Sequence, residues 1–141
     1  MSSVSPVMLI TGASRGIGAA TARLAAQQGY ALAINYLHNH QAAQQLQAEL
    51  LQQGARVALF CADLREEAAI LRLFADCDEK LGRLSVLVNN AAILKPQTDI
   101  SGIDTARMQA IFSTNVFAPF ICAREAVLRM STQRGGNGGA I

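Results

Sequence analysis

Short apolar runs alternate with longer segments along most of this sequence, and this alternation restricts the folds open to the chain. The runs cover residues 7–10, 30–36, 57–61 and 84–88. Each has the length of a strand and is apolar apart from Asn35 and Ser85, without the alternation of a strand that faces water on one side. Such strands are typical of a parallel sheet that is buried on both faces and joined by right-handed helical crossovers. The sequence therefore predicts an α/β fold with a doubly wound parallel sheet.

The segments between the runs carry apolar residues three and four positions apart, as amphipathic helices do. We expect buried stripes of Ile17, Thr21, Leu24 and Gln28 in the first helix, of Ala43, Leu46 and Leu50 in the second, and of Ile70, Leu73, Phe74, Cys77 and Leu81 in the third. Gly29 and Gly54 follow the first two stripes. Glycine suits the left-handed conformation that commonly ends a helix.

The composition predicts a single domain over residues 1–141, because the chain has 51% apolar and 16% charged residues and a formal charge of +2. No run reaches the roughly 18 consecutive apolar residues of a membrane span, and the first residues of the sequence have no signal-peptide pattern. We therefore expect a cytoplasmic protein without a membrane partner. The arginines are scattered along the sequence, which argues against a nucleic-acid partner. Cys61, Cys77 and Cys122 lack metal-ligand spacing. We expect buried free thiols and no metal.

The first expected strand leads into the loop LITGASRGIGAA at residues 9–20. Gly12 permits a tight turn, while Gly16 and Gly18 remove side chains where a pyrophosphate and a neighbouring strand come close. A helix that begins near Gly16 would offer unpaired N–H groups and the positive end of its dipole to an anion. The Gly-Lys-Ser/Thr ending of a triphosphate loop is missing. We interpret the segment as a dinucleotide-binding loop; the alternative is a tight turn without a ligand.

The second expected strand ends in Asn35-Tyr36-Leu37-His38, where a dinucleotide fold that binds NAD normally has an acid for the ribose 2′-hydroxyl. The first acidic residue of the chain is Glu49. Arg15 supplies a planar guanidinium that suits a 2′-phosphate. The sequence therefore favours NADP over NAD. The alternatives are that Arg15 is a solvated surface side chain and that His38 and His40 face solvent.

Four motifs together resemble those of the short-chain dehydrogenase/reductase family. They are TGASRGIG at 11–18, Asp63-Leu64 after the third run, NNAA at 89–92 and FSTN at 112–115. The resemblance spans essentially the whole chain and implies a Rossmann fold that binds NAD(P). The expected cofactor contacts are Gly12, Ser14, Arg15, Gly16, Ile17, Gly18, Asn35, Tyr36, Asp63, Leu64, Asn89 and Ala91.

The resemblance also implies roles for the second and third motifs. Asp63 would accept a hydrogen bond from the adenine amine and Leu64 would lie on the adenine, which fits a carboxylate at the carboxyl edge of a sheet. Alternatively, Asp63 caps a helix that begins near Arg65. The segment 89–92 would line the cofactor, and its asparagines also satisfy backbone groups at a strand end. Ala92 departs from the glycine usual in the family and slightly narrows the pocket.

Asn115 is the expected catalytic residue. It lies on an apolar-striped segment from about residue 105 to 130, four residues before Pro119. Proline has no N–H for the carbonyl of the residue four positions earlier, so the Asn115 carbonyl should be released and the helix bent. In the family that this chain resembles, the matching carbonyl holds a water of the proton relay. The alternative is a kink that only improves packing.

The proton donor of the family, a serine followed by a Tyr-x-x-x-Lys pair, is absent from this sequence. Tyr30 and Tyr36 are followed four residues later by Ile34 and His40, and the lysines are Lys80 and Lys95. By the family pattern, Ala140 and Ile141 would open strand five. We therefore expect a Rossmann domain that is truncated after the start of strand five and incomplete at its carboxyl end.

The sequence thus predicts an NADP(H)-dependent oxidoreductase that transfers hydride between nicotinamide and a small-molecule carbonyl or alcohol, present here as a cofactor-binding fragment. The completed protein would form a homo-oligomer. One alternative is a catalytically inactive nucleotide-binding remnant of a disrupted gene. Another is an α/β domain with an interaction role and no nucleotide, which would require all four motif matches to be accidental.

We predict that the 141-residue chain alone does not reduce carbonyl compounds, because it has no Tyr-x-x-x-Lys pair to donate the proton. The measurement is NADPH oxidation with a panel of ketones and aldehydes. Joining a carboxyl half from a family member should restore turnover, and substituting Asn115 in that chimera should lower it. Turnover by the chain alone above a heat-inactivated control would contradict the prediction.

Overall fold

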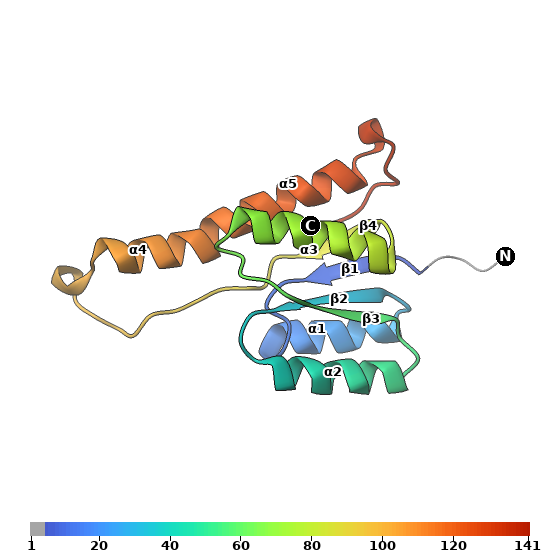
Figure 1. Ribbon diagram of the computed structural model, residues 1–141, viewed down its shortest axis with the longest axis horizontal. Helices are drawn as coiled ribbons and strands as arrows, with labels where there is room; N and C mark the ends of the chain where they lie inside the picture. Colours follow the sequence, from blue (N-terminus) through green and yellow to red (C-terminus); the bar gives the residue numbers. More distant parts are fainter. Residues whose placement is uncertain (1–4) are drawn as a thin grey trace.

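Four parallel strands form one sheet in the computed structural model, which describes residues 5–141 (Figure 1). The strands are β1 Val7–Ile10, β2 Ala31–Tyr36, β3 Val57–Cys61 and β4 Leu84–Val88. Their order is β3-β2-β1-β4. The chain therefore adds β2 and β3 on one side of β1 and then crosses to add β4 on the other. This arrangement confirms the predicted doubly wound parallel sheet.

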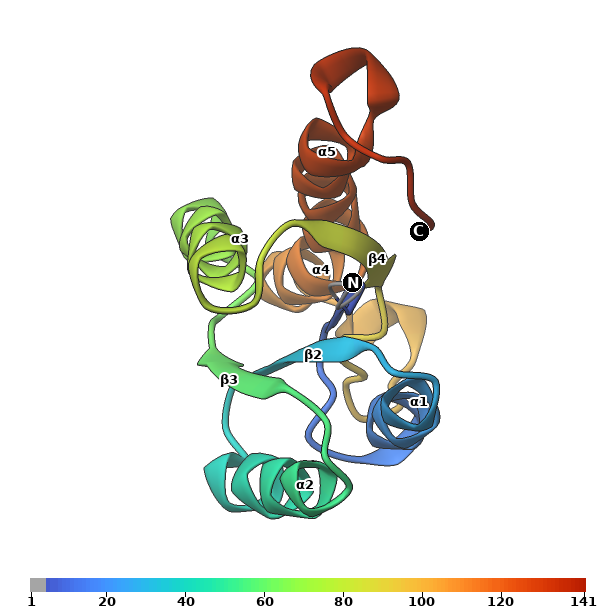
Figure 2. The same ribbon diagram turned by 90° about the vertical axis from the view of Figure 1, so that its right-hand side faces the viewer.

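Helices connect the strands and continue after the last one. The first three are α1 Gly16–Gln27, α2 His40–Gln52 and α3 Glu67–Leu81. After β4 come the short helix η1 Ile100–Gly102, α4 Thr105–Phe112, the π-helical segment η2 Ser113–Phe117, α5 Ala118–Met130 and the short helix η3 Thr132–Arg134. Figures 1 and 2 show α1 and α2 on one face of the sheet and α3 and α5 on the other.

Each face of the sheet has its own apolar core. Under α1 and α2, the buried residues are Met8, Ile10, Ala13, Ala19, Ala22, Ala25, Leu32, Ile34, Leu46 and Leu50. Under α3 and α5, they include Val7, Leu9, Phe60, Ile70, Leu73, Phe74, Leu84, Leu87, Cys122 and Met130. Because successive residues of a strand point to opposite faces and both sides of β1 and β2 are covered, their sequences are apolar except for Asn35.

The expected stripe of α1 is wrong, whereas those of α2 and α3 are confirmed. Ile17 and Leu24 are 81% and 62% exposed. The face that packs on the sheet instead consists of Gly18, Ala19, Ala22 and Ala25. Small side chains let this helix approach the sheet closely, and larger ones on the same face would hold it away. Size and not hydrophobicity alone thus decided which side of α1 is buried.

The two helix-ending glycines adopt the conformation that the sequence predicted. Gly29 and Gly54 both have φ of +83°. Side chains are disfavoured in this region, and glycine has no such cost.

The stretch Thr105–Met130 is long and apolar enough to cross a membrane, with a mean hydropathy of 1.3 in its most apolar window. Length and composition alone are weak indications, because a core helix of a soluble protein passes the same test. Here α5 packs against α3 and β4 through Ala118, Cys122, Ala126 and Met130. Its apolar residues are therefore used, at least in part, to cover the sheet.

The last residues lie beside β4. Ala140 forms an isolated parallel bridge with Val86, its N–H donates to the Ser85 carbonyl, and its carbonyl accepts from Leu87 N–H. This is where the family pattern predicted the start of a fifth strand.

The three thiols differ from the expectation that all are buried. They are free, but only Cys77 and Cys122 are buried, and Cys61 is exposed at the end of β3. The end of an edge strand is open to solvent even where the residues before it are covered. Burial raises the pKa of the Cys77 and Cys122 thiols to about 12.

We predict that a disulfide reagent at pH 7 to 8 modifies one thiol per folded chain, at Cys61. The thiolate is the nucleophile, and the two buried thiols remain protonated and covered. In denaturant all three should react, which provides the control. Rapid reaction of three thiols in the folded chain would contradict this packing, and Cys61→Ser should abolish the native reaction.

Candidate active site

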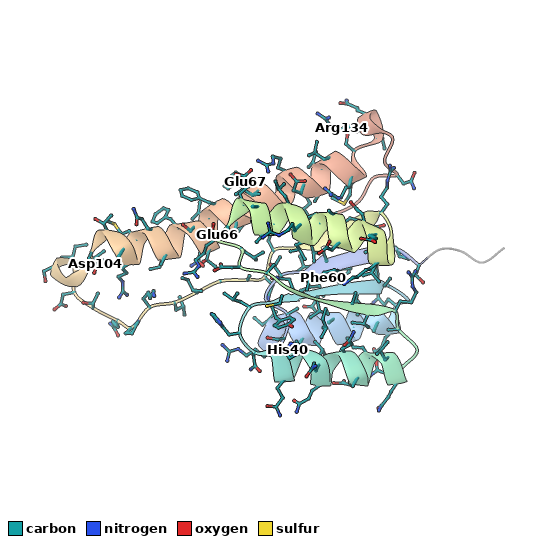
Figure 3. The ribbon with its side chains drawn as sticks, in the orientation of Figure 1. His40, Phe60, Glu66, Glu67, Asp104 and Arg134 are labelled. Carbon is teal, nitrogen blue, oxygen red and sulfur yellow. The ribbon has the colours of Figure 1, made fainter. Side chains whose placement is uncertain are left out.

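A cleft of about 910 Å³ opens at the carboxyl ends of the strands. Figure 3 shows His40 at the start of α2 and Glu66 just before α3, both at this edge of the molecule. The cleft is lined by Gly12, Ser14, Arg15, Gly16, Asn35, Tyr36, Leu37, His38, Asn39, Ala62, Asp63, Leu64, Arg65, Asn90, Ala91, Ala92, Ile93, Leu94, Lys95 and Thr114. In doubly wound folds, ligands bind at this edge where the strand order reverses.

The glycine loop forms one wall of the cleft, and two of its glycines are required by close contacts. A Cβ on Gly12 would lie 2.8 Å from the Ala91 Cα, and Gly12 has φ of +60°. A Cβ on Gly18 would lie 2.6 Å from the Asn90 side-chain nitrogen and 2.8 Å from the Ala13 Cα. Gly16 has open space around it, so its φ of +59° explains the glycine there.

The helix after this loop begins at Gly16, as the sequence predicted, and Arg15 is its N-cap. No side chain caps this helix end in the described part of the chain. The N–H groups of the first turn therefore keep the capacity to bind an anion. Among residues 5–141, no acidic side chain pairs with Arg15, which lies exposed in the cleft wall.

Thr11 and Asn90 fix the loop to the end of β4. The Thr11 hydroxyl donates to the Val88 carbonyl and accepts from the N–H groups of Asn90 and Ala91, at 3.0 Å each. The Asn90 amide donates to the carbonyls of Thr11 and Gly12 at 2.8 and 3.1 Å. Asn90 belongs to the segment 89–92, whose asparagines were expected to satisfy backbone groups at a strand end, and these bonds confirm that expectation. Thr11 was not among the expected contacts, although it belongs to the first of the four motifs.

Asn35 fixes the same loop from the other side. Its side chain accepts from Gly12 N–H at 3.2 Å and donates to the carbonyls of Phe60 and Ala62. The residue is only 2% exposed. Both the oxygen and the nitrogen of its amide are thus hydrogen-bonded within the protein. Asn35 would therefore affect ligand binding mainly by fixing the position of Gly12.

Tyr36 ends β2 and lies 6% exposed at the cleft. Its hydroxyl is hydrogen-bonded to the Nδ1 atom of His40 in the first turn of α2. Burial raises the pKa of Tyr36. The Asn39 side chain caps α2 by accepting from Ala42 N–H. These contacts orient the segment 36–40, which borders the place where a nucleotide ribose binds in folds of this kind.

Asp63 follows β3 and pairs with Arg65 instead of capping α3, whose N-cap is Glu66. The Arg65 guanidinium lies 2.5 to 3.0 Å from the Asp63 carboxylate oxygens, and Arg65 N–H donates to Oδ1. The arginine lowers the pKa of Asp63. Leu64 is mostly covered by the core beneath α3, at 7% exposed, although it also borders the cleft.

The side chain of Asn115 forms two hydrogen bonds with one residue. It accepts from Ile93 N–H at 2.8 Å and donates to the Ile93 carbonyl at 2.9 Å. Asn115 lies in the π-helical segment before Pro119, where Ala118 N–H donates to the Ser113 carbonyl five residues earlier. The helix is therefore irregular where the proline predicted it, and the asparagine ties it to the loop after β4.

Most of the expected site residues meet at the cleft. Ile17, Gly18, Asn89 and the expected catalytic residue Asn115 are not among its lining residues. Gly18 lies behind Asn90, and the Asn89 amide donates to the Pro119 carbonyl at 3.4 Å.

Comparisons with known proteins agree with this fold. The sequence model of the family described as short chain dehydrogenase matches residues 6–140. An uncharacterized oxidoreductase of Escherichia coli, YgfF, is 43% identical over 135 residues, which are 96% of this chain and 55% of that protein. A 3-oxoacyl-[acyl-carrier-protein] reductase of Synechocystis is 32% identical over 92% of this chain and 52% of its own length.

Solved structures give the same result. A putative short-chain alcohol dehydrogenase from Sinorhizobium meliloti superposes with a TM-score of 0.87 at 32% identity, over 96% of this chain and 52% of that one. A Burkholderia cenocepacia short-chain dehydrogenase, solved with NADP, superposes with a TM-score of 0.85 at 30% identity, over 89% and 51%. With its Rossmann-like sheet and glycine loop, the chain belongs to the short-chain dehydrogenase family of oxidoreductases. It spans about half the length of the relatives it matches.

We predict that Asn35→Asp destabilises the chain by roughly 2 to 4 kcal/mol, because a buried carboxylate would face the two carbonyls that now accept from the amide. Urea unfolding of both proteins measures the difference. Asn39→Asp is the matched control at the same edge of the sheet. Aspartate caps helices as well as asparagine does, so its effect should stay within about 0.5 kcal/mol. Equal stability of the two variants would show that the Asn35 contacts are dispensable.

Proposed function

We propose that this chain is the cofactor-binding half of an NADP(H)-dependent oxidoreductase that acts on a small-molecule carbonyl or alcohol. The observation that carries the proposal is the cleft wall formed by the glycine loop and the end of β2. Within residues 5–141, it combines an uncapped helix end, an arginine without an acidic partner and no acid at the end of β2. The nicotinamide cofactor would supply or accept the hydride.

The residues present fit such a cofactor. Side chains at Gly12 and Gly18 would collide with neighbouring residues, so glycine at both positions lets the loop pack closely against Ala91 and Asn90. The loop lines the cleft through Gly12, Ser14, Arg15 and Gly16. Its N–H groups can bind a pyrophosphate, and the planar guanidinium of Arg15 can bind a phosphate on the adenosine ribose. Two related structures support this choice, since one was solved with NADP and another, a blue fluorescent protein from a metagenomic library, with NADPH.

Further roles follow from position. The Asp63 carboxylate would accept from the adenine amine, and the backbone of residues 89–92 would border the nicotinamide half. We propose that Asn115 acts in proton transfer through its main-chain carbonyl, while its side chain holds Ile93. The remaining proton donor would come from outside the 141 residues. Assembly into a homo-oligomer is proposed for the completed protein, supported by exposed Phe112, Phe117 and Phe120 on the helices after β4.

We predict that NADP(H) binds more tightly than NAD(H) and that Arg15→Ala removes most of the difference. A lost charge-assisted hydrogen bond weakens NADP(H) binding by roughly 1.5 to 3 kcal/mol, with little change for NAD(H). Calorimetric titration of both cofactors measures this. Arg23→Ala, on the same helix but paired with Glu49, is the control. Equal affinities for the two cofactors in the parent, or an unchanged NADP(H) constant in Arg15→Ala, would refute the proposal.

A further inference from the structure

The ion pair of Asp63 and Arg65 lies in the wall of the proposed cofactor cleft and has no evident role in the fold. Both residues come from the turn between β3 and α3. Their side chains are 25% and 51% exposed. An exposed pair between residues two positions apart joins no separate elements and adds little stability. Its geometry is nevertheless well defined, because the guanidinium contacts both carboxylate oxygens of Asp63.

The charged side chains that line the cleft indicate what this pair does. Among the described residues that line the cleft, Asp63 is the sole carboxylate, and Arg15, Arg65 and Lys95 are the cations. Asp63 is ionised at neutral pH, as aspartates ordinarily are, and Arg65 lowers its pKa further. A bare carboxylate here would repel a phosphate on the adenosine ribose.

We propose that Arg65 is a specificity-determining positioning residue, which neutralises Asp63 so that the cleft accepts a cofactor with a phosphate on its adenosine ribose. This inference rests on the proposed function and deepens it. Asp63 keeps an acceptor for the adenine amine, while its charge is cancelled by a neighbour in the same turn. A chain with Asp63 and no such neighbour would prefer the phosphorylated cofactor less strongly, even with Arg15 present.

The experiment measures the ratio of the dissociation constants for NAD and NADP in the 141-residue chain with Arg65→Gln, Asp63→Asn and both changes together. Arg65→Gln should lower the preference for NADP roughly three- to tenfold, the effect of one partly screened charge. Asp63→Asn should preserve or raise the preference. The double variant should recover the parent ratio, because no uncompensated carboxylate remains.

Arg23→Gln is the matched control, since Arg23 contacts Glu49 through two hydrogen bonds of 2.8 Å outside the cleft. It should leave the ratio unchanged. The effect of Arg65→Gln should also shrink between low and high salt, as expected for exposed charges. The same ratio can be read with adenosine 2′,5′-bisphosphate against adenosine 5′-monophosphate, which need only the adenosine side of the cleft.

An unchanged ratio in Arg65→Gln would overturn the inference. So would a double variant that stays as weak for NADP as Arg65→Gln, because Arg65 would then contact the phosphate directly. Failure of the proposed function looks different: the parent itself would bind both cofactors equally, and Arg15→Ala would have no effect. Circular dichroism of each variant separates loss of binding from loss of folding.

Discussion

Polar side chains at the ends of β2 and β4, the two strands on either side of β1, hold the backbone of the glycine loop, and the whole cleft depends on this fixation. Asn35 bonds Gly12 from β2, while Asn90 bonds Thr11 and Gly12 from beyond β4. A loop with three glycines has high conformational entropy when free, so it needs such partners to stay in one shape. Fixing it also fixes the start of α1, and with it the N–H groups that face the cleft. The site is therefore organised before any ligand arrives.

The helices on the two faces of the sheet pack against it with side chains of different size. On one face, α1 approaches closely through glycine and alanine, which keeps its N-terminus near the strand ends. On the other, α3 and α5 fill the space with larger side chains such as Phe74, Ile70 and Met130. Arg129 joins these two helices, since it pairs with Asp78 on α3 and with Glu125 on α5. The helix whose N-terminus forms the anion site is thus the one that packs through small residues.

The one negative charge among the described residues that line the cleft is neutralised by a neighbouring residue. Asp63 is paired within its own turn, whereas Arg15 on the facing loop has no acidic partner among residues 5–141. The net excess is positive, which suits a ligand with several phosphates. Asn115 adds a neutral contact to the loop after β4, so the far end of the cleft is held by hydrogen bonds and not by charge.

The sequence by itself determined the alternation of strands and helices, the parallel sheet, the position of the glycine loop and the irregular helix at Pro119. These follow from local rules: apolar periodicity, the conformations open to glycine and the missing N–H of proline. Tertiary structure decided the rest. It buried the alanine face of α1 in place of Ile17 and Leu24, exposed Cys61, turned Asn35 inward to bond Gly12, and paired Asp63 with Arg65. Each depends on which surfaces meet across the sheet and on the room left between them, and a linear pattern does not contain those distances.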